Sequence, residues 1–229
     1  AIIDGGRVVA AEGFGQAELY KPYLKAHILQ LKDAILGYDP TDVERVMLKI
    51  RRWGAFKPWG TSVSAIEMAL WDIAGKVAGL PIHKLMGSFR TSAPAYASSA
   101  VLLSPEAYAE EAQSFQARGW GAYKIHPPTQ WETDIAVCEA VRKAVGDRYR
   151  IMLDSTWSYD YVAALRVGQA AQSLGFYWYE DPLVEDDMAG YVKLKKQLSI
   201  PILATEYAPG GHTAYAPWLI AQATDYLRG

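Results

Sequence analysis

The segment Arg150–Asp154 reads RIMLD, and two later segments repeat its form, FYWYE at Phe176–Glu180 and ILATE at Ile202–Glu206. Each is a short apolar run that ends in a carboxylate, as expected of a buried strand whose last residue reaches an edge of a sheet. The interval from position 154 to position 180 is 26 residues, and so is the interval from 180 to 206. This regular recurrence predicts a repeated strand-and-helix unit that carries one carboxylate each time.

The same alternation of strands and helices extends in both directions from these segments. We predict further strands at Ala95–Ala100, Ala122–His126 and Asp225–Leu227. Amphipathic helices are predicted between the strands at Pro105–Arg118, Trp131–Val145, Val162–Leu174 and Met188–Leu198. Strands that alternate with helices favour a parallel sheet with right-handed crossovers, and hence an α/β fold.

Six such strands are compatible with a (β/α)₈ barrel or with a doubly wound sheet. No GxGxxG or GxxxxGK[ST] loop follows a predicted strand, which disfavours the nucleotide-binding form of the doubly wound sheet. The first part of the chain has a different pattern: Ile2–Ile3 and Val8–Val9, with glycines nearby, predict a small antiparallel meander, and Ala65–Val77 has helical spacing. We therefore expect two domains, residues 1–90 and 91–229.

Composition narrows the class of ligand. Hydrophobic residues make up 51% of the chain and charged residues 21%, and the net charge is -2 without long runs of one sign. Neither nucleic acid nor a membrane is therefore an expected partner. Cys138, the single cysteine, cannot form an internal disulfide and excludes a cysteine-rich zinc site. With no signal-peptide pattern and no long apolar run in the sequence, we expect a cytoplasmic protein that acts on a small molecule.

The three strand-end carboxylates predict a metal site. The carboxyl ends of parallel strands meet at one edge, so Asp154, Glu180 and Glu206 are expected at the same height on one rim. Like charges so close raise one another's pKa, whereas a divalent cation makes the arrangement favourable. Ligands that are all oxygen select a hard ion, so Mg²⁺ is expected, with Mn²⁺ as the nearest competitor. The alternative is that each acid caps the helix that follows its strand.

Lys124 and His126 lie on the predicted strand that precedes the strand of Asp154. Side chains alternate along a strand, so both point to one side, toward the axis if the sheet closes into a barrel. A buried Lys needs a counter-charge, which a substrate carboxylate could supply. An imidazole with a pKa of about 6.5 can act as a base near neutral pH. The alternative is a structural Lys–carboxylate pair beside a rim His bonded to a loop carbonyl.

The segment Ala65–Lys76 reads AIEMALWDIAGK, and GLPIHKLMG follows at Gly79–Gly87. This pair resembles the signature helix and turn of the mandelate racemase and muconate lactonizing branch of the enolase superfamily. The segments Leu153–Asp154, Tyr179–Pro182 and Ala204–Glu206 resemble the metal-ligand strand ends of that family in identity, order and spacing. The resemblance extends from about residue 40 to the end of the sequence.

The resemblance implies a modified (β/α)₈ TIM barrel with an N-terminal α+β capping domain. Residues 91–229 would supply barrel strands one to six, with two further strands beyond Gly229, and the first capping strand would precede residue 1. Asp154, Glu180 and Glu206 would hold Mg²⁺, while Lys124 and the metal stabilise an enediolate. Sites of this superfamily use a Lys or His base. His126 stands where the family commonly has a second Lys, so His126 is assigned as the base, and a homo-oligomer is expected.

Among the reactions of this branch we favour dehydration of an acid sugar to a 2-keto-3-deoxy acid. Members with polar, aromatic-lined pockets often act on such substrates, and Trp157, Tyr159, Tyr207 and His212 are the candidates to line one. Racemisation or epimerisation uses the same enediolate but needs bases on both faces of the carbon, and lactone-forming cycloisomerisation ranks third. A metal-binding barrel without catalytic activity is the alternative of another class.

Overall fold

The computed structural model describes residues 2–4, 7–9, 23–52, 60–206 and 214–228. The chain divides into two compact units, residues 1–92 and 93–229. Each unit has its own cluster of buried apolar side chains.

The first unit combines a two-stranded antiparallel sheet with a small helical core. Its elements are β1 (Ile2–Asp4), β2 (Arg7–Val9), α2 (Tyr23–Ile35), α3 (Val43–Arg52), α4 (Gly60–Ala78) and α5 (Ile82–Leu85). Val43, Val46, Met47 and Ile50 recur at helical spacing on α3 and are buried against residues of α2 and α4. The helix predicted at Ala65–Val77 is confirmed, although α4 begins earlier.

The second unit is a six-stranded sheet in which every neighbouring pair is parallel. Its strands are β3 (Ala97–Ser98), β4 (Ala122–Ile125), β5 (Arg150–Asp154), β6 (Tyr179–Glu180), β7 (Ile202–Ala204) and β8 (Tyr226–Leu227). The strand order follows the chain from β3 to β8 without a reversal. A doubly wound sheet reverses its order at a switch point, whereas a barrel wall does not. The α/β fold with a barrel-type sheet is confirmed.

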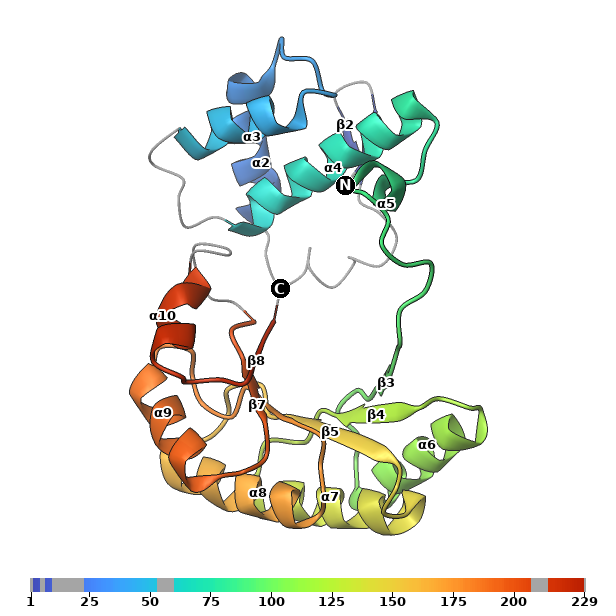
Figure 1. Cartoon of the computed structure of the whole chain (residues 1–229), viewed down its shortest axis with the longest axis vertical. Coiled ribbons are helices and arrows are strands. Elements are labelled where there is room, and N and C mark those ends of the chain that lie inside the picture. Colours follow the sequence, from blue (N-terminus) through green and yellow to red (C-terminus); the bar gives the residue numbers. More distant parts are fainter. Residues whose placement is uncertain (1, 5–6, 10–22, 53–59, 207–213, 229) are drawn as a thin grey trace. The chain divides into compact units, whose positions relative to one another are not determined.

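Helices alternate with these strands at nearly the predicted positions. The four predicted helices are α6 (Pro105–Ala117), α7 (Trp131–Val145), α8 (Tyr161–Ser173) and α9 (Met188–Gln197). A further helix, α10 (Tyr215–Ile220), was not predicted. Helices α6 to α9 cover one face of the sheet (Figure 1). Ser104, Asp160 and Asp187 cap α6, α8 and α9, since each side chain accepts a hydrogen bond from a backbone N–H of the first turn. Such caps contribute about 1 kcal/mol each.

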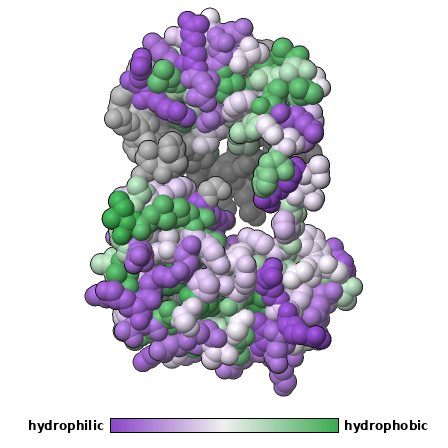
Figure 2. Space-filling model, in the orientation of Figure 1, coloured by the Kyte–Doolittle hydropathy of each residue, from purple (hydrophilic) through white to green (hydrophobic). Residues whose placement is uncertain are grey.

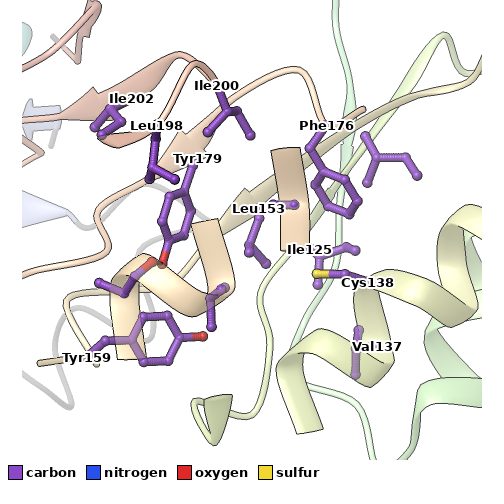
Figure 3. Close-up of a cluster of buried hydrophobic side chains, with 14 of the residues drawn as sticks. Ile125, Val137, Cys138, Leu153, Tyr159, Phe176, Tyr179, Leu198, Ile200 and Ile202 are labelled. Atoms are coloured by element: carbon purple, nitrogen blue, oxygen red, sulfur yellow. Dashed lines mark hydrogen bonds between the residues drawn. The ribbon is translucent and has the colours of Figure 1, made fainter. Parts of the chain in front are cut away.

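The core of this unit lies between the sheet and those helices. Leu153 and Tyr179 of the strands and Val137 and Cys138 of α7 belong to it, and all four are essentially inaccessible to solvent (Figure 3). The hydroxyl of Tyr179 donates to the carbonyl of Ala164 of α8. The visible surface of this unit is mostly hydrophilic, and its clearest apolar patch lies over α10, where Leu219 and Ile220 are exposed (Figure 2). Across the part of the chain that the structure describes, each helix is too short or too polar to cross a membrane.

Several strands end earlier than the sequence predicted. We expected β7 to reach Glu206 and β4 to reach His126, but they end at Ala204 and Ile125. In β7 the physical reason is a backbone turn, because Thr205 adopts a φ of +82° that no strand can contain. Glu206 therefore sits on a turn after β7, and His126 lies just beyond the end of β4.

Close packing of α8 on the sheet gives the first testable prediction. A Cβ atom on Gly168 would lie 2.5 Å from Leu198 Cδ1 and 3.1 Å from Tyr179 Cε1. Replacing Gly by Ala inside a helix normally gains about 1 kcal/mol, but overpacking a core costs about 1–3 kcal/mol. We therefore expect Gly168→Ala to lower the free energy of unfolding, measured by urea denaturation. Gly121→Ala, which meets no atom within 4 Å, is the control; a Gly168 variant as stable as that control would contradict the packing described.

Candidate metal centre

Asp154 and Glu180 lie side by side at the carboxyl ends of β5 and β6. They are register partners, and each side chain is 2% exposed. Glu206 departs from this register. Glu180 of β6 pairs with Leu203 of β7, which lies 23 residues later in the chain. Glu206 therefore lies three residues beyond the residue that is level with Glu180. The prediction of equal height is therefore wrong for Glu206, because equal spacing in sequence does not fix the length of each connection.

Lys124 of β4 lies between the two buried acids. Its Nζ is 2.6 Å from Asp154 Oδ2 and 3.1 Å from Glu180 Oε2, and the side chain is 4% exposed. Burial alone would lower the pKa of Lys124, but the charges of Asp154 and Glu180 outweigh it and raise that pKa. Trp178 also donates its indole N–H to Glu180 Oε2 at 3.0 Å. Lys124 thus finds its counter-charge in the carboxylates themselves and does not depend on a substrate for it.

His126 lies one residue beyond β4 and contacts Asp154 from the other side. Its Nε2 is 3.0 Å from Asp154 Oδ2, and its Nδ1 is 2.8 Å from the carbonyl oxygen of Ser99. A carbonyl and an ionised carboxylate only accept hydrogen bonds, so these partners assign a proton to both ring nitrogens. The hydrogen bond to Asp154 raises the pKa of His126, although burial opposes it. These contacts therefore favour the protonated ring of His126.

Asp154 stays ionised in spite of its burial. Burial alone would raise the pKa of Asp154, but hydrogen bonds and charges from His126 and Lys124 bring it down to about 2. Its second oxygen, Oδ1, accepts the backbone N–H of Thr156 at 3.2 Å. Both oxygens of this carboxylate are thus oriented by partners from neighbouring segments.

Arg228 follows β8 and joins the acids from the remaining side. Its Nη1 is 2.6 Å from Glu180 Oε1 and 3.9 Å from Asp154 Oδ2, and its Nη2 is 2.9 Å from Glu206 Oε1. Burial would lower the pKa of Arg228, but the charges of Glu180, Glu206 and Asp154 raise it. The sequence interpretation missed this residue. Its position directly after a predicted strand, on the same rim as the three acids, was the signal available.

Asp181 is a fourth acid that the sequence interpretation missed. It is fully buried, and neither carboxylate oxygen has a hydrogen-bond partner in the described structure. Oxygen atoms of Asp154, Glu180 and Asp181 all lie within 4.8 Å of one another. Burial, followed by the charges of Asp154, Glu180 and Glu206, raises the pKa of Asp181 to about 8. In a regular strand Asp181 would point away from Glu180, but its φ of +44° breaks that alternation.

Unfavourable backbone conformations gather around these acids. Thr156, Trp157, Asp181 and Thr205 all have φ values between +44° and +82°, which cost non-glycine residues about 1–3 kcal/mol each. A hydrogen bond of 2.7 Å from Trp157 N to the carbonyl of Asp181 ties two of these turns together. Thr205 has the largest of these φ values, which glycine would adopt without strain. Four of the seven non-glycine residues with positive φ in the described structure thus lie on this rim.

The predicted substrate-contacting residues have different outcomes. Trp157 is half-buried on the turn after Asp154. Tyr207 and His212 lie outside the described residues. Tyr159 does not line a pocket, because its ring lies in the core (Figure 3) and its hydroxyl donates to the buried carboxylate of Asp134. The expectation for Tyr159 was therefore wrong, since a tyrosine near a strand end can also serve to satisfy a buried acid.

The donor set fits a hard divalent cation. The capping alternative fails for the buried pair, because Asp160 and Asp187 cap the helices that follow Asp154 and Glu180. A buried carboxylate without a partner, as at Asp181, is costly unless a cation or a proton compensates it. Carboxylate oxygens clustered in this way are the ligands that Mg²⁺ or Mn²⁺ would take.

Comparison with known proteins places both units in one family. Residues 6–87 match the N-terminal domain of mandelate racemase / muconate lactonizing enzymes, and residues 107–229 match the enolase C-terminal domain-like family. An L-talarate/galactarate dehydratase from Salmonella typhimurium is 32% identical over 211 residues, covering 89% of this chain and 52% of the relative. A D-galactarolactone cycloisomerase from Agrobacterium fabrum is 31% identical over 207 residues, covering 85% and 53%.

A solved structure agrees with these sequence matches. D-glucarate dehydratase from Agrobacterium tumefaciens, crystallised with magnesium, has a TM-score of 0.82 and 33% identity, covering 88% of this chain and 58% of that chain. The present chain spans about half the length of the curated relatives it matches. The sheet order, the cluster of acids and these matches lead to one assignment: the chain belongs to the mandelate racemase and muconate lactonizing branch of the enolase superfamily.

Proposed function

We propose that this chain carries the metal site of an enzyme that removes the α-proton of a carboxylate substrate in a Mg²⁺-dependent reaction. The observation that carries the proposal is the buried cluster of Asp154, Glu180 and Asp181, with Lys124 and His126 in direct contact with it. A protein that needed only stability would not bury several acids at one strand edge, because each is costly to desolvate. The magnesium in the related dehydratase structure supports the choice of ion.

In this proposal Asp154 and Glu180 hold the ion together with Glu206, the third ligand predicted from the sequence, and Asp181 is a further acid whose oxygens lie within 4.8 Å of those of Asp154 and Glu180. When bound, Mg²⁺ supplies positive charge to the substrate carboxylate and stabilises the charge that develops as the α-proton leaves. Glu206 comes from the turn after β7 and reaches the cluster through Arg228. The acids thus approach from three consecutive strand ends.

Lys124 would stabilise the enediolate. Its ammonium group touches both Asp154 and Glu180 and is almost completely removed from water. A donor that is already oriented in a dry site stabilises developing negative charge without having to reorganise. Lys124 can therefore donate to a substrate oxygen that approaches the two acids.

His126 is our proposed base. It is the more accessible of the two candidates, with 27% of the side chain exposed, and its Nε2 points at Asp154. While Asp154 binds that nitrogen, His126 keeps its proton and cannot act as a base. If the Asp154 carboxylate instead bound a divalent cation, His126 would lose the partner that raises its pKa and would become able to accept a proton.

We propose dehydration of an acid sugar as the reaction, supported by the similarity to the talarate/galactarate dehydratase. Lactone-forming cycloisomerisation is the second candidate, supported by the D-galactarolactone cycloisomerase. Racemisation or epimerisation would need a second base on the opposite face of the carbon. We further propose that residues 1–90 act as a capping domain that contributes specificity.

Product analysis of the full chain tests the reaction. With Mg²⁺ and a panel of sugar acids we expect a 2-keto product, detected as its semicarbazone, whereas racemisation would introduce solvent deuterium at the α-carbon without loss of water.

Glu180→Gln should lower kcat/KM by more than about 100-fold, since even the partners of metal ligands contribute roughly 10–100-fold. The exposed Glu132→Gln is the control. Full activity and Mg²⁺ dependence in Glu180→Gln would rule out the proposed site, and no turnover or exchange would favour a catalytically silent barrel.

Stability of the metal-free protein tests the role of Lys124. Lys124→Met leaves Asp154 and Glu180 buried without their shared cation, and breaking a buried ion pair in this way costs about 3–5 kcal/mol. We expect a clear fall in Tm in EDTA, partly restored by Mg²⁺. Lys143→Met removes an exposed lysine of α7 and should leave Tm nearly unchanged. Equal Tm values for the two variants would contradict the described ion pairs.

A further inference from the structure

We propose that Arg228 is an internal competitor of the divalent cation: it holds the acids together when the ion is absent and must leave them before the ion can bind. The inference rests on the proposed metal site and goes beyond it, because it assigns a role in metal binding to a cationic residue that is not a ligand. It concerns the residues of this chain and can be tested without substrate.

The guanidinium group of Arg228 contacts two acids at once. Two of its nitrogens contact two different acids, Glu180 at 2.6 Å and Glu206 at 2.9 Å, and Asp154 lies 3.9 Å away. The planar guanidinium suits carboxylates, so one side chain can neutralise several acids at once. Glu206 lies out of register with the other two acids, and its ion pair with Arg228 joins it to the cluster. Arg228 therefore stands between the acids that the ion would have to contact.

Both carboxylate oxygens of Glu180 already accept hydrogen bonds. Glu180 Oε1 faces Arg228, while Oε2 accepts from Lys124 and Trp178. An ion that binds Glu180 and Glu206 together must displace the Arg228 contacts at both. A divalent cation beside Arg228 would also place like charges a few ångströms apart.

Differences in burial decide which cation leaves. Lys124 is 4% exposed and enclosed by the sheet. If its ammonium group left the two acids, it would lie in a buried position without a counter-charge, which is unfavourable. Arg228 is 36% exposed, and its long side chain can carry the guanidinium group from the rim into water. We therefore expect Arg228 to leave the acids when the ion binds, while Lys124 keeps its contacts with Asp154 and Glu180.

Two consequences follow from this exchange. In the metal-free protein Arg228 offsets the repulsion among the acids and keeps the site assembled. In the presence of Mg²⁺ the same contacts have to be broken, so the affinity for the ion is lower than the acids alone would give.

The test compares Arg228→Met with wild type in the full chain, using calorimetric titration with Mg²⁺ alone and thermal denaturation in EDTA. We expect the variant to bind Mg²⁺ at least about 10-fold more tightly, because the ion no longer has to displace the Arg228 contacts at Glu180 and Glu206, and the loss of one charge-assisted hydrogen bond is enough for roughly that factor. Its Tm in EDTA should fall, and its gain in Tm on adding Mg²⁺ should exceed that of wild type. Arg228→Lys keeps the charge but offers one nitrogen in place of the planar guanidinium fork, and it should lie between the two.

Arg150→Met is the matched control. It removes the same charge from the opposite end of β5, where Arg150 packs over the ring of Tyr177, and should leave Mg²⁺ affinity within about twofold of wild type. Arg228→Met binding no more tightly than Arg150→Met would overturn the inference and leave the proposed function standing. Absence of Mg²⁺ binding in wild type and all variants would instead contradict the proposed function, and this inference with it. If Arg228→Met is unfolded in EDTA, Mg²⁺ must refold it; failure to refold would also overturn the inference.

Discussion

Repulsion between buried carboxylates on adjacent parallel strands is the constraint around which this rim is arranged. Asp154 and Glu180 face each other in register with almost no access to water, and Asp181 and Glu206 are two further acids beside them. Ionised acids in such positions are tolerated only with compensating cations or protons. Lys124, His126 and Arg228 supply the compensation from three different segments, while Asp181 remains without a hydrogen-bond partner in the described structure. The raised pKa of Asp181 favours a proton there, so a divalent cation at this rim would replace part of the existing compensation.

The two ends of the sheet use polar groups in different ways. At the amino end of β5, the guanidinium of Arg142 donates hydrogen bonds to the carbonyls of Gly146, Tyr149, Leu174 and Gly175. Those hydrogen bonds satisfy backbone carbonyls of two connecting loops, so the guanidinium group of Arg142 has a structural role. At the carboxyl end, the cations instead contact acids that a ligand could take over. Structural hydrogen bonds to the backbone are thus found at one end, and the proposed metal site lies at the other, as in βα barrels in general.

Much of this architecture could be predicted from the sequence, because hydrophobic periodicity and strand-end carboxylates depend on local spacing. The alternation of strands and helices, the parallel sheet and the adjacency of Asp154 and Glu180 follow from that spacing. The height of Glu206 does not, because it depends on the path of a connection whose length the sequence leaves free. Asp181 depends on one left-handed backbone angle, and Arg228 on a side chain that reaches across strands. These tertiary features decide the electrostatics of the site, and sequence spacing alone does not contain them.

The most direct measurement is anomalous diffraction from crystals of the full chain soaked in Mn²⁺, which reports the position of the ion independently of turnover. The account predicts one strong anomalous peak within coordination distance of oxygens from Asp154, Glu180 and Glu206, with the guanidinium group of Arg228 moved away from Glu180. A map without a peak among these carboxylates, or with the ion bound elsewhere while Arg228 keeps its contacts, would contradict it.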